Sequence, residues 1–378
     1  MDSLSIDGSI LKGGGQVVRN SISLSALLGK PVSIQNIRLD RNPPGLKNQH
    51  RTGAFLHYYN HDLGFLAYRT QGLELAAQIS SARLTGAING SSEIEFVPGR
   101  INLPNHYRAD SVTAGSIALI LQVTLPLLLF SSTPLPASTL TVLGGTNATL
   151  APQVDYTKHV FLPFIRKHSG LENCSLDIKK MGYFPKGGGE VELSVIPLSG
   201  GQKLRSFSLM NPGRVKSIGG ISHFAGLPYW VGDGIVGGAI RRLAKAGFIA
   251  GVEDHGPVDV SPELSKERRD VPVDIKCKRE PSRLTTGAGS GIVLWAELEG
   301  GGFIGGSAVG RKGQAEASIG EEAVDELLKG LDHGGCVDEV EISTFFSPFS
   351  NHGFPVAAGS NHHIYGSGRW KVRSEVWN

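Results

Sequence analysis

The chain has 378 residues, of which 40% are hydrophobic and 19% are charged, and its 37 basic and 34 acidic residues give a net charge of +3. This composition supplies enough apolar material for a buried core, so it excludes a wholly disordered chain and a coiled coil. Three widely spaced cysteines exclude a disulfide scaffold and a zinc site of cysteine type. The N-terminus has no secretory signal, so we expect an intracellular globular protein.

The N-terminal part of the sequence predicts a β-α-β-α-β-β unit. Alternating and helical hydrophobic spacing indicate the elements, and Gly29 with Pro31 ends the first helix. The predicted elements are a strand over 3–6, a helix over 17–28, a strand over 32–37, a helix over 46–59, and strands over 73–79 and 92–97.

A similar order of elements follows, which predicts an internal structural repeat. The elements are a helix over 114–128, a strand over 139–143, a helix over 155–168, and strands over 174–179 and 190–195. No charged residue occurs over 111–154, but the apolar run is shorter than the ~20 residues that a bilayer requires. It also contains Gln122 and Pro126, so we predict a buried helix that leads into a buried strand.

The rest of the chain departs from this pattern. Residues 200–287 have strand and helix signals of their own, with a helix over 236–246, and we interpret them as an inserted α/β domain. The fold class is then α/β (α+β). After the inserted segment, the pattern predicts a strand over 291–297 and an amphipathic helix over 319–329. Residues 340–378 show neither helical nor strand periodicity, and we expect a poorly ordered tail.

A glycine loop opens the first predicted helix and indicates a site for an anion. Gly13, Gly14, Gly15 and Gln16 precede Arg19 by about one helical turn. Backbone amides and the helix dipole at such a position favour negative charge. The alternative is a tight strand-to-helix turn with a surface arginine.

Two further segments favour a phosphorylated ligand. Lys186 and three glycines form a second glycine loop. A basic cluster surrounds a Pro-Pro-Gly turn, and the planar guanidinium group binds phosphate in two-point contacts, although a solvated basic loop is the other reading. The cluster consists of Arg38, Arg41, Lys47, Gln49, His50 and Arg51.

The motifs DGSILKGGGQVVR, IRLDRNPPGLKNQH, TAGSIALILQ, GGTNATLAPQVDY, GYFPKGGGEVELSV and GGCVDE occur in this order. The sequence from about 4 to 339 thereby resembles the RNA 3'-terminal phosphate cyclases, and the catalytic branch more than the cyclase-like branch. The resemblance implies a large domain of three repeated β/α units, with a smaller α/β domain inserted between the second and the third. Residues 1–199 would then hold repeats 1 and 2, and residues 288–339 a truncated third repeat. It also implies ATP and a divalent metal, Mg or Mn, as cofactors, RNA with a 3'-phosphate end as partner, and a nuclear protein.

The family's reaction gives roles to the motif residues. A histidine forms a covalent His-AMP with ATP, AMP passes to the RNA 3'-phosphate, and the 2'-hydroxyl closes a 2',3'-cyclic phosphate. By motif, the resemblance implies that the arginines hold phosphates, that Gln49 and His50 orient the RNA end or the nucleotide, and that Gln122 and Pro152 line the adenylate pocket. The implied catalytic residues are Arg19, Arg41 and His50, the RNA-phosphate contacts Arg38, Arg41 and Gln49, and the further ATP contacts Gly13, Gly14, Gly15 and Gln16.

Two departures from the family pattern affect the expected activity. Lys12 stands where the family usually has a glutamate, which puts the metal site in question. After Glu339 the pattern is lost, and His352, His362 and His363 lie outside any matching motif, with His363 nearest the expected nucleophile position. We therefore expect a weakened cyclase, or alternatively a non-catalytic RNA-end-binding or ribosome-biogenesis protein. An enolpyruvyl transferase is a third reading, which the GGGQ and NQH motifs disfavour.

Overall fold

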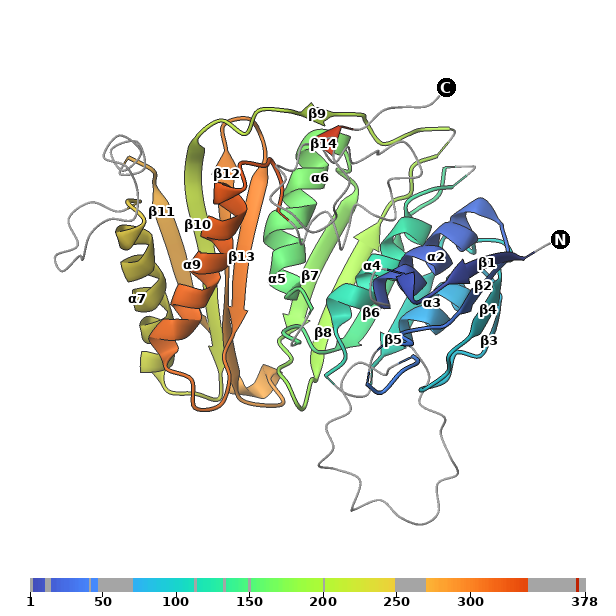
Figure 1. The fold of residues 1–378 in the computed structure, drawn as a ribbon, viewed down its shortest axis with the longest axis horizontal. Helices are drawn as coiled ribbons and strands as arrows, with labels where there is room; N and C mark the ends of the chain where they lie inside the picture. Colours follow the sequence, from blue (N-terminus) through green and yellow to red (C-terminus); the bar gives the residue numbers. More distant parts are fainter. Residues whose placement is uncertain are drawn as a thin grey trace, which may run out of the picture. The chain divides into compact units, whose positions relative to one another are not determined.

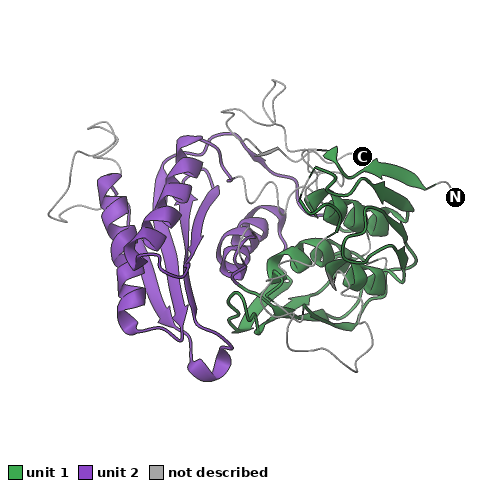
Figure 2. Cartoon of the chain, turned by 60° about the horizontal axis from the view of Figure 1, so that its bottom comes forward, with its two compact units in different colours: residues 1–146, 173–203 green, residues 147–172, 204–378 purple. Residues whose placement is uncertain are grey.

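The computed structural model describes residues 3–10, 15–40, 42–46, 71–111, 114–131, 134–148, 151–199, 201–248, 270–338 and 372–373. The chain forms two compact units, unit 1 of residues 1–146 and 173–203 and unit 2 of residues 147–172 and 204–378 (Figure 2). Both units combine helices with mixed β-sheets, which confirms the predicted α/β class. No helix among these residues is long and apolar enough to cross a membrane.

The first sheet of unit 1 has the strand order β1-β2-β4-β3 (Figure 1). Strands β1 and β2 are parallel, and β4 is antiparallel to both β2 and β3. Buried residues alternate along β2 and β4, so one face of each strand packs on the core. The elements are β1 (Leu4–Asp7), α2 (Gly15–Leu28), β2 (Val32–Gln35), α3 (Gln71–Ile79), β3 (Arg83–Thr85) and β4 (Ile94–Val97).

The second sheet of unit 1 repeats this arrangement in the order β5-β6-β8-β7. Its first two strands are again parallel, and the third and fourth are antiparallel. The shared order agrees with the predicted repeat, but the third sheet of the chain has a different order, and the repeats stay a prediction. The elements are β5 (His106–Asp110), α4 (Ile117–Leu128), β6 (Ser138–Gly144), β7 (Cys174–Lys180) and β8 (Gly189–Val195).

Helix α4 forms the centre of unit 1. Every residue of this uncharged helix is buried, and it packs against both α2 and α3. Ser116 caps its start by accepting a hydrogen bond from the Leu119 amide at 3.4 Å. The Ser23 hydroxyl of α2 donates to the Val123 carbonyl of α4 at 2.7 Å. The close packing of α2 on α4 determines which of their polar side chains meet.

Unit 2 is built on a sheet of order β11-β10-β12-β13, in which β10 and β11 are parallel. Helices α7 and α9 cover one face with a core that includes Ile235, Leu294 and Leu327. The other face carries the helical run α5, η1 and α6, where His159 stacks on Trp295 with ring centroids 5.0 Å apart. The elements are α5 (Val154–Tyr156), the π-helix η1 (Thr157–Phe161), α6 (Leu162–Ser169), β9 (Ser208–Leu209), β10 (Val215–Ala225), α7 (Tyr229–Lys245), β11 (Val273–Arg279), the 3-10 helix η2 (Ser282–Leu284), β12 (Gly289–Leu298), β13 (Phe303–Val309), α9 (Glu316–Asp332) and β14 (Val372–Arg373).

One sequence prediction needs correction, and two others fall mostly on residues that the structure does not describe. The strand predicted over 73–79 is wrong, because this segment forms α3, whose Leu, Glu, Ala and Gln residues are good helix formers. The helix predicted over 46–59 lies outside the described residues, apart from Leu46, which is not helical. The predicted tail over 340–378 also lies outside them, except for β14, which pairs with β9.

The predicted domain boundary at residue 287 separates strands that pair with one another. Strand β12 begins at Gly289 and is antiparallel to β10 over its whole length. Residues on both sides of the boundary therefore share one sheet. This sheet alone does not test the prediction that the large domain consists of repeats interrupted by an inserted domain.

Candidate functional site

The start of α2 holds the first group of predicted site residues. Gly15 opens the helix, Gln16 follows it, and no acidic residue occurs in the first turn. The amides and dipole of this helix end therefore present positive charge without a carboxylate of the same turn to offset it. Gly13 and Gly14 lie outside the described residues.

Arg19 extends from α2 and bends back toward the start of its own helix. A Cβ atom added to Gly15 would lie 2.9 Å from Nη1 of Arg19, so the guanidinium lies beside the first residue of the helix. Its Nε donates to Oε1 of Gln122 at 2.7 Å, and burial lowers the pKa of Arg19 to about 10. Arg19 thus keeps its charge at neutral pH, and no carboxylate among the described residues forms an ion pair with it.

Gln122 provides the opposite side of this arrangement from α4. Its side chain is buried, and Oε1 accepts the bond from Arg19, which leaves Nε2 as a donor. That nitrogen is buried and has no hydrogen-bond partner among the described residues. A buried donor without a partner costs about 1–3 kcal/mol. Within the described ranges, Arg19 has no counter-ion and Nε2 of Gln122 has no acceptor, and this arrangement suits an anionic ligand.

The other predicted site residues are placed as follows. Arg38 is half-buried in the turn after β2, with φ of 55° in the left-handed region. Pro152 belongs to unit 2 and immediately precedes Gln153, the N-cap of α5. The predicted residues that lie outside the described part are Gly13, Gly14, Arg41, Gln49, His50 and His363, together with Lys12.

The second glycine loop is a hairpin turn and opens no helix. Lys186 lies between β7 and β8, and the Gly187 amide donates to the Tyr183 carbonyl at 2.8 Å. Gly187 and Gly188 have φ of 65° and 73°, which explains why glycine occupies both positions. The backbone of this hairpin turn presents no helix dipole, so the argument for the start of α2 does not extend to it, and its role in binding phosphate stays a prediction.

Unit 2 contains a buried titratable cluster that the sequence reasoning missed. Asp155 on α5 lies 3.8 Å from Nε2 of His159 and 4.0 Å from Nε2 of His223 on β10. Burial raises the pKa of Asp155 to about 6, against the opposing charge of Lys278, and it lowers the pKa of His159 to about 4 and of His223 to about 3. Both imidazoles are neutral at pH 7, so neither forms an ion pair with the carboxylate there.

Gln153 fixes the proton on His223. Nε2 of Gln153 donates to the carbonyls of Ile292 and Ala308 at 3.0 and 3.1 Å, which directs its Oε1 to Nε2 of His223 at 2.9 Å. An amide oxygen only accepts, so Nε2 of His223 carries the proton. The motif GGTNATLAPQVDY contains Gln153 and Asp155, but their partners lie far along the chain, and no local signal indicated the cluster.

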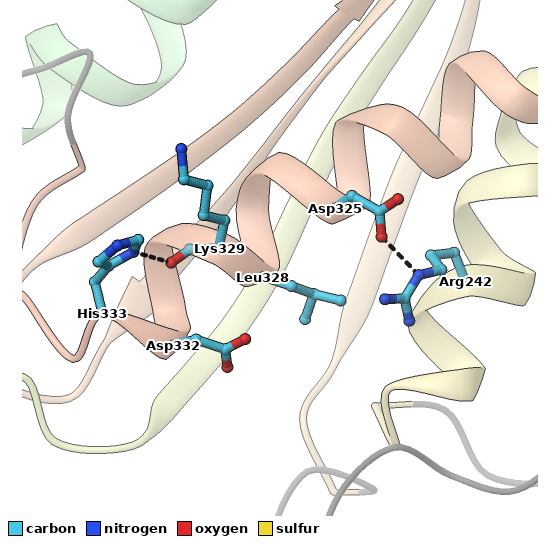
Figure 3. Close-up of a pocket in the computed structure, with 6 residues that line it drawn as sticks. All are labelled: Arg242, Asp325, Leu328, Lys329, Asp332 and His333. Atoms are coloured by element: carbon cyan, nitrogen blue, oxygen red, sulfur yellow. Dashed lines mark hydrogen bonds and ion pairs between the residues drawn. The ribbon is translucent and has the colours of Figure 1, made fainter. Parts of the chain in front are cut away.

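A shallow surface pocket of about 340 Å³ lies in unit 2 between α7 and α9 (Figure 3). Nε of Arg242 donates to Oδ1 of Asp325 at 2.7 Å across it, and His333 hydrogen-bonds the Lys329 carbonyl. Carboxylates and cations are both present in its lining, so the pocket favours neither an anion nor a cation. Its lining residues are Arg242, Asp325, Leu328, Lys329, Asp332 and His333, none of which is a predicted site residue.

The comparisons with known proteins agree on one family. The sequence model for "RNA 3'-terminal phosphate cyclase" matches residues 10–57 and 60–349. The chain belongs to the RNA 3'-terminal phosphate cyclase family. It is 34% identical over 333 residues to the RNA 3'-terminal phosphate cyclase of Pyrobaculum neutrophilum, covering 88% of this chain and 81% of that protein. The cyclase of Thermococcus onnurineus is 37% identical over 338 residues, covering 89% and 83% of the two chains. The probable cyclase of Dictyostelium discoideum is 36% identical over 339 residues, covering 88% and 67%.

The family match bears on the two departures seen in the sequence. It ends at residue 349, ahead of His352, His362 and His363. Among the described residues, no group of three histidine, cysteine, aspartate or glutamate side chains could hold a metal ion. The described part of this family member thus holds an anion-suited site at α2 and α4, and it gives no position for the implied metal.

Proposed function

We propose that this member of the family converts the 3'-terminal phosphate of RNA into a 2',3'-cyclic phosphate in an ATP-dependent reaction that proceeds through a covalent His-AMP. Family membership supports the cyclase reaction, and the site at α2 and α4 supports the use of phosphorylated ligands. ATP would supply the activated adenylyl group. The residues of this chain would bind and orient the phosphates.

The observation that carries this proposal is that Arg19 forms no ion pair with a carboxylate of the described residues. A buried guanidinium without a counter-ion is costly, and proteins pair such charges or bind an anion there. Arg19 hydrogen-bonds Gln122 and no carboxylate of the described residues. A phosphate group of ATP or of the RNA end would provide the missing negative charge.

Each residue of the site has a distinct role in the proposal. Arg19 would neutralise phosphate oxygens, whose charge the reaction redistributes, and its N–H groups would fix their orientation. Gln122 would orient Arg19 through Oε1 and donate to the ligand through Nε2, for which no described residue is an acceptor. Gly15 would leave the space that the guanidinium needs at the helix end. Arg38, Arg41, Gln49, His50 and Pro152 keep the phosphate, orienting and adenylate-pocket roles that the family resemblance implies.

A second candidate function follows from the end of the family match at residue 349. The chain would then bind 3'-phosphorylated RNA ends without closing the cyclic phosphate, because the histidines beyond that point lie in no family motif. Both functions use the same phosphate site. They differ in whether a nucleotide becomes bonded to the protein.

One incubation separates the two functions. The full chain is mixed with α-labelled ATP, a divalent cation and a 3'-phosphorylated oligoribonucleotide. A labelled protein adduct together with a phosphatase-resistant cyclic end supports the cyclase. Oligonucleotide binding without an adduct or product supports the second candidate, and no preference for a 3'-phosphate over a 3'-hydroxyl end contradicts both. The matched control is Arg19→Met, which should lose the preference for the phosphorylated end.

A further inference from the structure

The surface around the start of α7 carries aromatic and cationic side chains that the proposed site does not use. Tyr229 and Trp230 are 63% and 67% exposed, more than any other large hydrophobic residue that is exposed in the described part of the chain. The guanidinium of Arg279, at the end of β11, lies 4.5 Å from the centroid of the Tyr229 ring. We call Tyr229, Trp230 and Arg279 the aromatic patch.

The position of the aromatic patch in the sheet is one at which α/β proteins bind ligands. Strands β10 and β11 are parallel, and the patch lies where β10 leads into α7 and where β11 ends. In open α/β sheets, ligands bind outside the carboxyl ends of the parallel strands. The first turn of α7 has no acidic residue, and no described side chain caps it, so its amides add positive potential.

Of the cations beside the patch, two lysines pair with carboxylates, whereas Arg279 forms no ion pair with a described carboxylate. Lys276 lies 3.8 Å from Asp274, and Lys278 lies 2.8 Å from Glu280, so carboxylates of the same segment offset both lysines. Arg279 instead stacks on Tyr229, which leaves the donors at the edge of its guanidinium plane for phosphate oxygens. Asp233 is exposed and lies one turn into α7. Its negative charge confines the positive potential of the helix amides to the first turn.

We propose that the aromatic patch binds the single-stranded body of the RNA, upstream of the 3' end that the family acts on. Unpaired bases would stack on the rings of Tyr229 and Trp230, and Arg279 would contact a phosphodiester. Stacking platforms of aromatic residues combined with cations are the common means of holding single strands without sequence preference. This inference rests on the proposed function, because it takes RNA as the ligand.

The stability of the fold does not explain the exposure of these rings. Tyr229 packs edge-on against buried Phe224, with centroids 6.1 Å apart, and this contact holds the ring in place while most of it faces solvent. Trp230 makes no ring contact or hydrogen bond with any of the described residues. The Tyr229 ring is held by Phe224, and the Trp230 indole follows at the next position of α7 without a ring contact or hydrogen bond to the described residues. The two rings can therefore offer stacking surfaces without loss of core packing.

The test measures binding of the full chain to three 3'-phosphorylated ligands: a single strand of about 12 nucleotides, a dinucleotide, and a blunt duplex. Trp230→Ala should weaken binding of the long single strand about tenfold. It should leave the dinucleotide unchanged, because that ligand does not extend beyond the reactive end, and the duplex unchanged, because its bases are already stacked. Trp230→Phe should restore most of the lost affinity, since a flat ring is retained.

Arg279→Met tests the phosphate contact separately. The slope of log affinity against log salt for the long single strand should become shallower by about 0.7. Met210→Ala is the matched control, because Met210 is an exposed large apolar residue of unit 2 outside the patch, and it should change no affinity. Unchanged thermal melting of all variants confirms that they fold.

The outcomes separate this inference from the proposed function. If the wild-type chain cyclises RNA but Trp230→Ala binds the long strand normally, the patch does not bind RNA and the inference is overturned while the function stands. If no cyclisation occurs but the long strand binds in a Trp230-dependent way, the inference stands while the function fails. An equal loss of affinity for the long single strand and the dinucleotide would also overturn the inference, because the patch would then act at the reactive end.

Discussion

Nε of Arg19 on α2 donates to Oε1 of Gln122 on α4 at 2.7 Å, which joins two residues that are 103 positions apart. The bond uses the Nε donor of the guanidinium, and Nη1 lies beside Gly15 at the start of α2. The same bond leaves Nε2 of Gln122 unpartnered among the described residues. The guanidinium of Arg19 and the side-chain amide of Gln122 thus both offer N–H donors in the region where the sequence predicted a bound phosphate.

Replacing Arg19 by lysine tests whether geometry or charge matters at this site. Arg19→Lys keeps a cation but loses the planar set of donors, so we expect affinity for ATP or a 3'-phosphate to fall about tenfold. Thermal stability should fall modestly, by about 1–2 kcal/mol in the free energy of unfolding, because the hydrogen bond from Nε to Gln122 is lost. Isothermal titration and thermal melting measure the two effects. Equal affinities of wild type and variant would exclude a directional phosphate contact.

Gly15→Ala should displace the guanidinium without touching it chemically. The added Cβ would lie 2.9 Å from Nη1 of Arg19, closer than such contacts occur. We expect a several-fold loss of ATP affinity in a folded protein. Gly72→Ala is the control, since its Cβ would make only an ordinary contact of 3.7 Å with Ile120. The prediction fails if Gly15→Ala and Gly72→Ala bind ATP equally well.

The pKa of Asp155 predicts how stability depends on pH. Its pKa is about 6 in the folded chain against 3.8 for an ordinary aspartate, so its stabilising contribution is present below pH 3.8 and is lost as pH rises through 6. This loss amounts to about 3 kcal/mol. Asp155→Asn removes the ionisation, so the variant should melt higher than wild type at pH 8, with a smaller difference at pH 5.

The titratable groups around Asp155 determine which pH dependence should remain in the Asp155→Asn variant. His223, with a pKa lowered to about 3, contributes stability that is present above pH 6.5 and is lost as pH falls toward 3. His159 acts in the same direction, while Lys158, Lys278 and Glu280 provide the nearby charges. Asp155→Asn should therefore still lose stability in acid. A melting curve that is parallel to wild type across pH 5 to 8 would contradict the raised pKa.

Asp338 should be essential for the stability of unit 2. Its Oδ2 accepts hydrogen bonds from the Tyr156 hydroxyl and from the Gly305 amide, at 2.5 and 2.6 Å. Asp338→Ala leaves both buried donors without this acceptor, and we expect a loss of about 3 kcal/mol in the free energy of unfolding. Tyr156→Phe removes only one of the two bonds and should cost about 1 kcal/mol. Urea titration of both variants compares the two losses.

Periodicity predicted the elements whose apolar residues recur regularly. The helix over 17–28 and the uncharged segment before residue 128 correspond to α2 and α4, and the alternating run over 190–195 corresponds to β8. Segment 73–79 was assigned wrongly, because a short apolar run has too few residues to distinguish a helix from a strand. Strand β13 was not predicted, since its glycines fit closely against Tyr156 and Ala323, contacts that no local pattern encodes.

The candidate site was predictable in residue type and less so in geometry. The glycine loop indicated the helix end at Gly15, and the resemblance to the family pointed to Arg19 and Gln122. The hydrogen bond between them depends on the packing of α2 on α4, which the sequence alone could not supply. The cluster around Asp155 was not predicted for the same reason, because His223 joins it from a strand in a different part of the chain.

The hydrogen bonds of Asp338 join parts of unit 2 that lie far apart in the chain. Its Oδ2 accepts from the hydroxyl of Tyr156, the last residue of α5, and from the amide of Gly305 in β13. One carboxylate thus couples a helix on one face of the sheet to the strand at the edge of the sheet. A substitution at position 338 would therefore disturb the helix and the edge strand together.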